Sequence, residues 1–505
     1  MHFLDLPVEL QTAVLRHLDH RSVLRCTLVC RQLHELVASS VELRYKVELV
    51  YDGLVDGAAY PPGMPYSRRL ERLLDRRSAW RTLAWRKHTT VTMPGSCRAY
   101  ELVGGIFAKV FESNGFCASR LPSATADERR LEIADLGVPV KDFAIDPTQG
   151  LIALLEQPGH DMQNDTEVAR VHLRAIGEDL SELHPDAKCP VLEFRTAGAI
   201  HGSTIQIADD VVGIYFWTPL HGVLVWNWMT GERLVYFQGD HGETPEDIWD
   251  FALLSSRAYM VTTLTGGGTI EIYTFGDDLS RDSGQEVTLV ATLCFFELHP
   301  MYGNLLIEAT TTTGPFTARV ALELPFGTAP TSRVHVFKLQ YAVPGYQPVC
   351  LVVHNRTLMQ YIENYRAGGG HVNVPWEAWG VDGSRAFILG NGSQWLRYVH
   401  GERVVCPILH DDRSTTFEVL DFNVHPTRDP QSPATDGMQL VTESSILPSR
   451  HQPLFDRPVV TCLPYRSVTV PDLYVGFMID GERLLGLKAS PFSSDSLGDI
   501  DVFSF

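Results

Sequence analysis

Residues 211–217 read VVGIYFW, and residues 223–232 read VLVWNWMTGE. Both runs are dense in β-branched and aromatic side chains, which suit the pleated, half-buried surface of a strand. The segment that ends the second run, Thr230-Gly231-Glu232, is typical of a connection between strands. This part of the chain is therefore predicted to form neighbouring β-strands with a turn after the second.

Similar strand-like runs recur on both sides of this pair, and few convincing helices are found after Thr89. The runs that carry the pattern are residues 142–155, 250–275, 333–341, 387–399, 420–422, 474–478 and 499–505. Groups of three or four strands recur roughly every 40–60 residues, which is the period of a propeller blade. We therefore predict a mainly β chain in which residues 91–505 form a degenerate β-propeller of about seven blades.

Two features bear on this architecture. Residues 226–232 resemble the Trp-Asp end of a WD-type blade, although the repeats are heavily degenerate. We expect the terminal strand, which ends at Phe505, to pair with a strand near Val91 to Leu102, because ring closure hides sheet edges. Two stacked β-sandwich domains are the competing architecture. Leucine-rich repeats are disfavoured because no Leu-x-x-Leu-x-Leu period is present.

The charges are unevenly distributed along the 505 residues, whose formal net charge is −19. Residues 1–90 carry 14 basic and 10 acidic side chains, whereas the remainder carries 28 basic and 51 acidic ones. Such an acidic surface repels nucleic-acid phosphates and anionic membranes, so neither is an expected partner. A basic head on an acidic body indicates two units with different partners.

The N-terminus lacks the basic and apolar regions of a signal peptide, and the nine cysteines are scattered. We therefore expect reduced thiols and a cytoplasmic or nuclear location, or both.

The first forty residues carry helical periodicity. Leu10, Val14 and Leu18 recur at i, i+4 and i+8, which gives one apolar stripe over three turns. Two further short helices are expected around residues 22–28 and 29–37. Three such helices cannot enclose much surface, so their remaining apolar face must be covered by another chain or by the next domain.

Residues 6–36 resemble the F-box consensus from end to end. That consensus runs Leu-Pro-x-Glu-Leu, an aliphatic helix, paired aliphatics, and then Val-Cys-Arg-x-Trp-x-x-Leu. Here the first motif is LPVEL at residues 6–10, the pair is Val23-Leu24, and the last motif is VCRQLHEL at residues 29–36. One departure is visible, since the family's frequent tryptophan is replaced by Leu33. We assign residues 1–42 to a three-helix F-box domain.

The resemblance implies docking onto a Skp-family adaptor, which links to a cullin and a RING subunit. Matched residue by residue, the motif assigns the docking face or its support to Leu6, Pro7, Leu10, Leu24, Val29, Cys30 and Leu33. The family's adaptor is acidic, which suits a basic head. The chain is then expected to be the substrate-recognition subunit of a Skp–cullin–F-box ubiquitin ligase whose β-domain binds an unknown protein target. The alternative is a non-catalytic propeller scaffold that uses the F-box for assembly without ubiquitination.

Residues 43–90 are expected to link the two units. Residues 51–65 are rich in Gly, Pro and small side chains and predict a loop. Residues 67–87 carry the apolar spacing of one amphipathic helix. We expect Trp80 and Trp85 to pack this helix against the β-domain. The resemblance to fungal F-box proteins is stronger here, since many of them carry a similar Ala-Trp-Arg helix at this place.

No motif predicts a catalytic residue, a cofactor site or a metal site. Cys26 and Cys30 lie one turn apart on an F-box helix, where burial is more typical than zinc ligation. His410-Asp411-Asp412 fits an exposed polar loop. The glycine runs at residues 266–268 and 368–370 lie between predicted strands and are expected to be turns, not phosphate-binding loops. An enzyme whose active site is built from distant loops is the third hypothesis.

The acidic body favours a basic target over a multiply phosphorylated one, because phosphorylated motifs are bound by arginine clusters. Arg257, Arg333, Arg385 and Arg397 lie in different predicted units. Convergence of these four side chains on one face would create such a cluster.

Overall fold

The structure is a computed structural model, and it describes most of the chain. The described residues are 3–57, 64–93, 95–112, 114–123, 126–133, 135–157, 167–177, 180–196, 198–218, 221–238, 248–276, 287–302, 305–321, 324–390, 397–425, 437–447, 454–470, 473–488 and 498–505. Within them the protein is mainly β, with 46% strand, and has seven α-helices. The fold class predicted from the sequence is confirmed.

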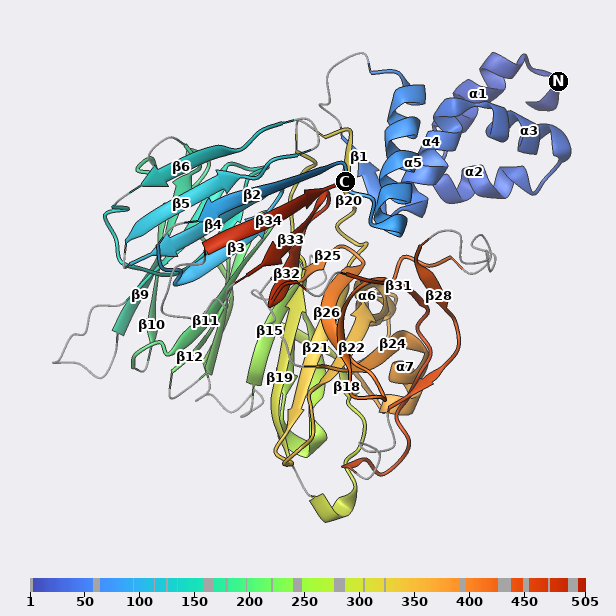
Figure 1. Ribbon diagram of the computed structural model, residues 1–505. Helices are drawn as coiled ribbons and strands as arrows, with labels where there is room; N and C mark the ends of the chain where they lie inside the picture. Colours follow the sequence, from blue (N-terminus) through green and yellow to red (C-terminus); the bar gives the residue numbers. More distant parts are fainter. Residues whose placement is uncertain are drawn as a thin grey trace.

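The N-terminal unit is helical and projects from one side of the molecule (Figure 1). Its helices are α1 (Val8–Arg16), α2 (His20–Thr27), α3 (Arg31–Ser39) and α4 (Val41–Tyr51). The N-cap of α2 is Asp19, whose carboxylate accepts the backbone N–H of Ser22 at 3.0 Å. The helices share one small core, formed by Leu15, Val23, Leu33, Leu36, Val37, Leu43 and Val47. The sequence predicts a domain of three helices, whereas the observed core also includes Leu43 and Val47 of a fourth helix, α4.

The rest of the chain forms seven sheets of at least four strands, which are the blades of a propeller. Blade 1 contains β3 (Ala99–Val103), β4 (Ile106–Phe111), β5 (Gly115–Arg120) and β6 (Arg129–Ile133). Blade 2 contains β7 (Val140–Asp146), β8 (Leu151–Glu156), β9 (Glu167–Ala175) and β10 (Val191–Thr196). Blade 3 contains β11 (Gly202–Ala208), β12 (Val211–Trp217), β13 (His221–Asn227) and β14 (Arg233–Gln238). Blades 4 and 5 are β15 (Ile248–Ser255), β16 (Ala258–Thr263), β17 (Thr269–Thr274) and β18 (Thr288–Cys294); and β19 (Leu306–Thr313), β21 (Val334–Tyr341), β22 (Val349–His354) and β24 (Ser384–Ile388).

Blade 6 contains β25 (Val399–His400), β26 (Arg403–Leu409), β27 (Thr415–Asp421) and β31 (Tyr465–Thr469), with β28 (Gln439–Val441) at its outer edge. Blade 7 contains β32 (Gly476–Ile479), β33 (Arg483–Leu487), β34 (Gly498–Ser504) and β2 (Lys87–Met93). Three short additions complete the strands: β23 (Val372–Val374) beside β18, β29 (Ser445–Ile446) with β30 (Val460–Thr461), and β1 (Leu54–Asp56) with β20 (Phe326–Thr328).

Blade 7 closes the ring with both ends of the propeller sequence. Strand β2 pairs antiparallel with β34, so that Val91 lies opposite Ile500. Both side chains are buried, in a core shared with blade 1. The prediction that the terminal strand pairs near Val91 and closes the ring is confirmed, and the ring of seven sheets replaces the β-sandwich alternative.

Burial explains why the inner blade strands read as continuous apolar runs. Every residue of β12 except Trp217 is buried, because neighbouring blades cover both faces of the sheet. The outermost strand of blade 2, β10, instead alternates between exposed and buried side chains. The tight connection predicted after β13 is also present: Gly231, with φ of 78°, lies between β13 and β14.

Two helices in the β-domain differ from the prediction that few helices follow Thr89. Helices α6 (Asn355–Arg366) and α7 (Trp376–Gly383) are inserted between β22 and β24 of blade 5. Residues 368–370 follow α6, so their predicted place between two strands is wrong, whereas residues 266–268 do form a turn between β16 and β17. Trp395 and Leu396, part of the strand expected over residues 387–399, lie outside the described residues.

Candidate docking site

The helical unit leaves part of its apolar surface uncovered. Leu10 on α1 is 52% exposed, Leu24 on α2 is 43% exposed, and Val29 in the turn before α3 is 71% exposed. The same elements also expose Val8, Val14 and Leu28. Several exposed large apolar side chains on one small unit are typical of an interaction site, so we treat them as a candidate site. We call these six residues the docking face.

The residues predicted for this site divide into two groups. Pro7, Leu10, Leu24 and Val29 are exposed and available to a partner. Leu33 is only 5% exposed, because it packs inside the helical core. The family's tryptophan position is therefore occupied here by a core residue that supports the docking face from behind.

Leu6 and Cys30 are half-buried, and Cys30 packs against that core. The amide of Gln11 holds the turn that carries Leu6, since its Nε2 donates to the carbonyl of Leu6 at 2.7 Å and to that of Leu4 at 3.2 Å. The sequence motif did not identify Val8, Val14 and Leu28 as part of the face. The i, i+4 stripe of Leu10 and Val14 is the signal that could have shown one of them.

The linker is a packed joint between the helical unit and the propeller. Helix α5 (Tyr66–Thr82) begins one residue before the predicted position and ends five residues earlier, because Leu83 adopts a left-handed conformation with φ of 48°. Helices α4 and α5 share a core with β1 and β20, made of Tyr45, Leu49, Leu54, Leu70, Leu73 and Phe326. The predicted loop thus contains a strand, β1, that pairs with β20 of the propeller.

A buried ion cluster holds α4 against α5. Arg77 of α5 donates from Nη2 to Glu48 Oε2 and from Nε to Asp52 Oδ1, both at 2.7 Å. The side chains of Glu48 and Asp52 are each 8% exposed. Burial raises the pKa of Asp52 above its ordinary value, and the charge of Arg77 opposes that rise.

Of the two tryptophans predicted to pack the linker helix against the β-domain, Trp80 makes the closer contact. Trp80 is fully buried and stacks on the terminal residue, Phe505, with ring centroids 4.0 Å apart. The guanidinium of Arg403 in blade 6 lies over the Trp80 ring, 4.8 Å from its centroid. Trp85 contributes less: it contacts Phe503 at 4.9 Å but stays 41% exposed.

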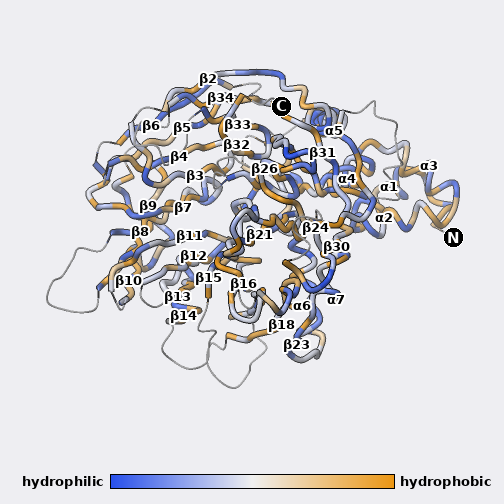
Figure 2. Tube along the Cα trace, turned by 60° about the horizontal axis from the view of Figure 1, so that its bottom comes forward, coloured by the Kyte–Doolittle hydropathy of each residue, from blue (hydrophilic) through white to orange (hydrophobic). Residues whose placement is uncertain are grey.

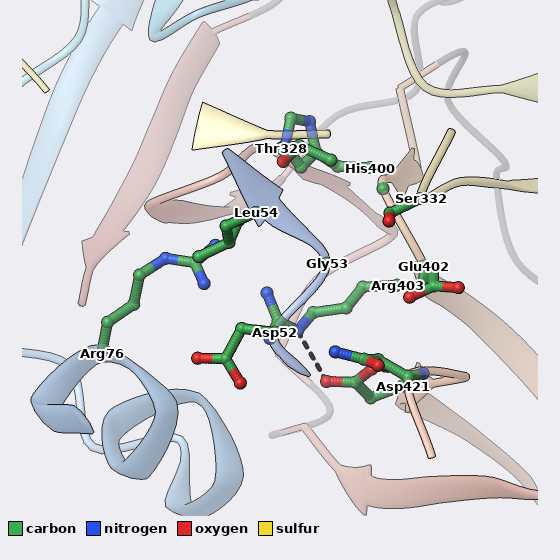
Figure 3. Close-up of a pocket in the computed structure, with 12 residues that line it drawn as sticks. Asp52, Gly53, Leu54, Arg76, Thr328, Ser332, His400, Glu402, Arg403 and Asp421 are labelled. Atoms are coloured by element: carbon green, nitrogen blue, oxygen red, sulfur yellow. Dashed lines mark hydrogen bonds and ion pairs between the residues drawn. The ribbon is translucent and has the colours of Figure 1, made fainter. Parts of the chain in front are cut away.

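A small polar pocket lies where the linker meets the segment around β20 and blade 6 (Figure 3). Its cavity of about 20 Å³ is large enough for about one water molecule. Arg76 of α5 reaches across to blade 7 and donates to the carbonyl of Gly481 at 2.7 Å, and burial lowers its pKa to about 10. On the propeller side, Arg403 Nε donates to Asp421 Oδ2 at 2.9 Å. Charges of both signs are matched here, so the pocket serves to join the two units.

The four arginines considered as a phosphate cluster do not form one. Each is engaged by groups in its own neighbourhood: Arg257 by Asp210, Arg333 by the carbonyls of Gly314 and Pro330, Arg385 by the carbonyls of Leu463 and Glu443, and Arg397 by Glu101. Arg333, Arg385 and Glu101 are buried. Arg333 and Arg397 do reach adjacent carbonyls, those of Gly314 and Thr313, but each of the four guanidinium groups is bound by groups of the propeller itself.

The polar candidates weighed for metal binding have other contacts. Cys26 and Cys30 pack against the helical core, and all nine cysteines have free thiols. His410 Nε2 lies 2.7 Å from the hydroxyl of Thr416, and Asp412 accepts from Ser414. Among the residues that the structure describes, no group of three potential metal ligands occurs, and no helix is long and apolar enough to cross a membrane.

Comparison with known protein families shows which family the helical unit resembles. The family model described as F-box-like matches residues 3–49, the segment that contains α1 to α4 up to Leu49. No curated protein matches the chain. The F-box match covers the docking face and ends inside the helix that packs on α5.

Solved propeller structures resemble the β-domain at low identity. The WD40 β-propeller domain of Doa1 is 11% identical, with 83% of this chain and 97% of that chain covered and a TM-score of 0.34. The β-propeller domain of Cps50 (Swd1) from Myceliophteria thermophila is 8% identical, with 83% and 98% covered and a TM-score of 0.40. Because both TM-scores are below 0.5, the blade count rests on the strand pairing of this chain itself. The chain therefore carries an F-box-like domain at residues 3–49 and a seven-bladed β-propeller in its C-terminal region, a combination that fits an F-box substrate adaptor in general.

Proposed function

We propose that this protein is the substrate-recognition subunit of a Skp–cullin–F-box ubiquitin ligase. The observation that carries the proposal is the exposed docking face on a domain that matches the F-box-like family, joined to a propeller. F-box domains generally bind Skp-type adaptors, and through the adaptor the chain would reach a cullin and a RING subunit. The propeller would hold the target protein.

The mechanism in this proposal is proximity. The joint made by Trp80, the Arg77 cluster and the β1–β20 pair fixes the helical unit relative to the propeller. A target bound to the propeller would be held at a defined position relative to the docked adaptor, which raises the effective concentration of its lysines near the conjugating enzyme. No side chain of this chain needs to make or break a bond. A cytoplasmic or nuclear setting for this assembly is part of the proposal, as expected from the scattered cysteines of the sequence.

Affinity purification of the full-length chain followed by mass spectrometry tests the proposal. The test variant replaces the exposed residues Leu10, Leu24 and Val29 by alanine, which leaves the helical core intact. The control replaces Leu183 and Leu473, which are 55% and 76% exposed on the propeller, by alanine. We expect a Skp-family adaptor and a cullin with the wild type and the control, and their loss with the test variant. Their retention by the test variant contradicts the proposal.

Target turnover separates the ligase from the scaffold alternative. Proteins retained by both the wild type and the test variant are candidate targets of the propeller. If the chain is a ligase subunit, their half-lives lengthen when the docking face is disrupted. If the chain is a scaffold, their half-lives stay the same although adaptor binding is lost.

A further inference from the structure

Lysine is scarce in this chain. Of its 42 basic residues, 7 are lysine and 35 are arginine. Residues 189–337 contain no lysine, and residues 339–487 contain none either. Lysine is ordinarily one of the commonest residues of soluble proteins, so seven in a chain of 505 residues is few. Both side chains supply positive charge, but it is lysine that accepts ubiquitin.

The proximity on which the proposed function depends acts on the chain's own lysines as well. A subunit docked in the ligase stays near the conjugating enzyme, which raises the effective concentration of every lysine that it exposes. In the transfer, the neutral Nζ of a lysine attacks the thioester that joins ubiquitin to the enzyme's cysteine. An isopeptide bond forms, the thioester bond breaks, and the proton that the nitrogen loses ends on the released thiol. An exposed lysine whose Nζ is free is best suited to this reaction.

Five of the seven lysines are at least half-buried and are held by other groups. Lys109 is fully buried on β4, and its Nζ donates to two backbone carbonyls at 2.9 and 3.0 Å. Lys46 on α4 donates to two backbone carbonyls of the F-box-like domain, and Lys141 donates to one of blade 3 at 3.4 Å. Lys87 and Lys338 each pair with a carboxylate, at 2.8 and 2.9 Å. These five are poorly placed to accept ubiquitin.

The two exposed lysines lie on opposite faces of the propeller. In a blade of four successive antiparallel strands, the first and third connections lie on one face and the second on the other. The linker meets the first connection of blade 7, where Arg76 donates to the carbonyl of Gly481. Lys188, in the third connection of blade 2, is therefore on the linker face. Lys488, in the second connection of blade 7, is on the far face and pairs with Asp501 at 2.9 Å.

Lys188 is presented by an anchored turn. Its backbone N–H donates to the carbonyl of Met229 in blade 3 at 2.9 Å, and the N–H of Ala187 donates to the carbonyl of His184 at 3.1 Å. The ring of His184 contacts Trp228 edge-on, with centroids 4.8 Å apart. The Lys188 side chain is exposed, and within the described ranges no hydrogen bond or ion pair holds its Nζ. Exposure, a free Nζ and a place on the linker face thus coincide at this one lysine.

We propose that Lys188 is the site at which this chain itself accepts ubiquitin when it is docked in the ligase, and that the scarcity of lysine confines self-modification to it. The chain can then stay beside the conjugating enzyme while target lysines are modified, and a single side chain sets the rate at which the subunit is modified in turn. This inference rests on the proposed function, because it concerns a reaction of the assembled ligase.

A reconstituted ligase tests the site. It contains the full-length chain, a Skp-family adaptor, a cullin–RING pair, a charged conjugating enzyme and ubiquitin with methylated lysines, so that each modified site gains one ubiquitin. Gel densitometry gives the rate, and mass spectrometry of tryptic peptides gives the modified residue. We expect Lys188 to carry most of the ubiquitin and Lys188→Arg, which keeps the charge, to slow the modification at least tenfold. Lys488→Arg is the matched control at an exposed lysine and should leave the rate unchanged.

A second variant tests the role of lysine scarcity. Arg233 is an exposed arginine at the start of β14, two residues after Gly231, whose added Cβ would lie 2.6 Å from Cys189 beside Lys188. Lys188→Arg combined with Arg233→Lys places a lysine on the same face again, and about a third or more of the wild-type rate should return. A double variant as slow as Lys188→Arg overturns the role given to scarcity. A wild-type rate in Lys188→Arg, or modification mainly at another lysine, overturns the site.

Capture of the adaptor and the cullin, measured on the same proteins, separates the two proposals. A chain that captures both but is not modified at Lys188 refutes this inference and leaves the ligase proposal standing. A chain that captures neither refutes the ligase proposal and this inference with it.

Discussion

Arg77 holds the joint between the F-box-like domain and the propeller, and Arg77→Ala should loosen it. The substitution leaves Glu48 and Asp52, each 8% exposed, without the cation that both of them contact. Removal of one partner from a buried ion pair costs about 3–5 kcal/mol. Arg77 keeps 16% of its side chain exposed, so the lower end, about 3 kcal/mol, is expected. This free energy corresponds to roughly a hundredfold increase in the local opening equilibrium.

Hydrogen–deuterium exchange of the peptides that cover α4, residues 41–51, measures this opening directly. We expect their exchange to be about a hundredfold faster in Arg77→Ala. The control is Arg68→Ala on the same helix, because Arg68 and its partner Glu71 are 58% and 54% exposed, and such surface pairs contribute about 0–1 kcal/mol. Equal exchange in the wild type and Arg77→Ala, or an equal effect of both substitutions, would refute the reasoning.

The same variant has a defined pH dependence. The pKa of Asp52 is raised by burial, so ionisation of its carboxyl opposes folding, and the stability that it contributes in acid is lost as the pH rises through its folded-state pKa. Removal of Arg77 takes away the charge that limits this rise. The deficit of Arg77→Ala should therefore be largest at neutral and alkaline pH and should shrink toward acidic pH.

Three further predictions follow from the packing of the propeller. Trp80→Ala should cost about 3–5 kcal/mol in thermal unfolding because the ring is fully buried, whereas Trp85→Ala, at a position 41% exposed, should cost less than half of that. Burial raises the pKa of the half-buried Asp142 to about 7, against the charges of Arg397 and Lys141. The stability that its carboxyl contributes is therefore present in acid and is lost as the pH rises through about 7. Asp142→Asn should stabilise the protein by about 1 kcal/mol at pH 8 and change its stability little at pH 5. Gly231→Ala should destabilise the protein by about 1–3 kcal/mol, since residue 231 has φ of 78° and an added Cβ would lie 2.6 Å from Cys189. A melting temperature equal to that of the wild type in Trp80→Ala, in Gly231→Ala, or in Asp142→Asn at pH 8 would contradict the corresponding prediction.

Local patterns in the sequence were sufficient to predict the helical head, the propeller and its closure. The i, i+4 spacing of Leu10 and Val14 and the alternation of strand runs and turns are properties of neighbouring residues, and they were read correctly. Helices α6 and α7 were missed, because α6 fully buries only two apolar side chains, Leu358 and Ile362, and α7 has just eight residues. Leu358 and Ile362 share a core with Ile270 and Ile272 of blade 4, and the helix contacts β17 and β18, which are distant in the chain. Figure 2 shows α6 beside β18.

The candidate sites could also be predicted only in part, because contacts between distant parts of the chain determine them. The F-box motif named the right segment but did not separate Leu33, which is in the core, from Val29, which is exposed. Burial depends on how the four helices α1 to α4 pack, and spacing alone does not determine it. Whether the four arginines converge could not be decided from the sequence, because partners such as Glu101 for Arg397 and Asp210 for Arg257 are distant in the chain.

Calorimetric titration of the purified full-length chain with a purified Skp-family adaptor tests the central claim most directly. The docking face predicts saturable one-to-one binding by the wild type. Alanine at Leu10, Leu24 and Val29 together should weaken it at least about a hundredfold, because truncation of a central interface residue commonly costs about 2 kcal/mol or more. Alanine at Leu183 and Leu473 on the propeller should leave it unchanged. Failure of the wild type to bind, or full affinity in the triple variant, would contradict the assignment of this face to the adaptor.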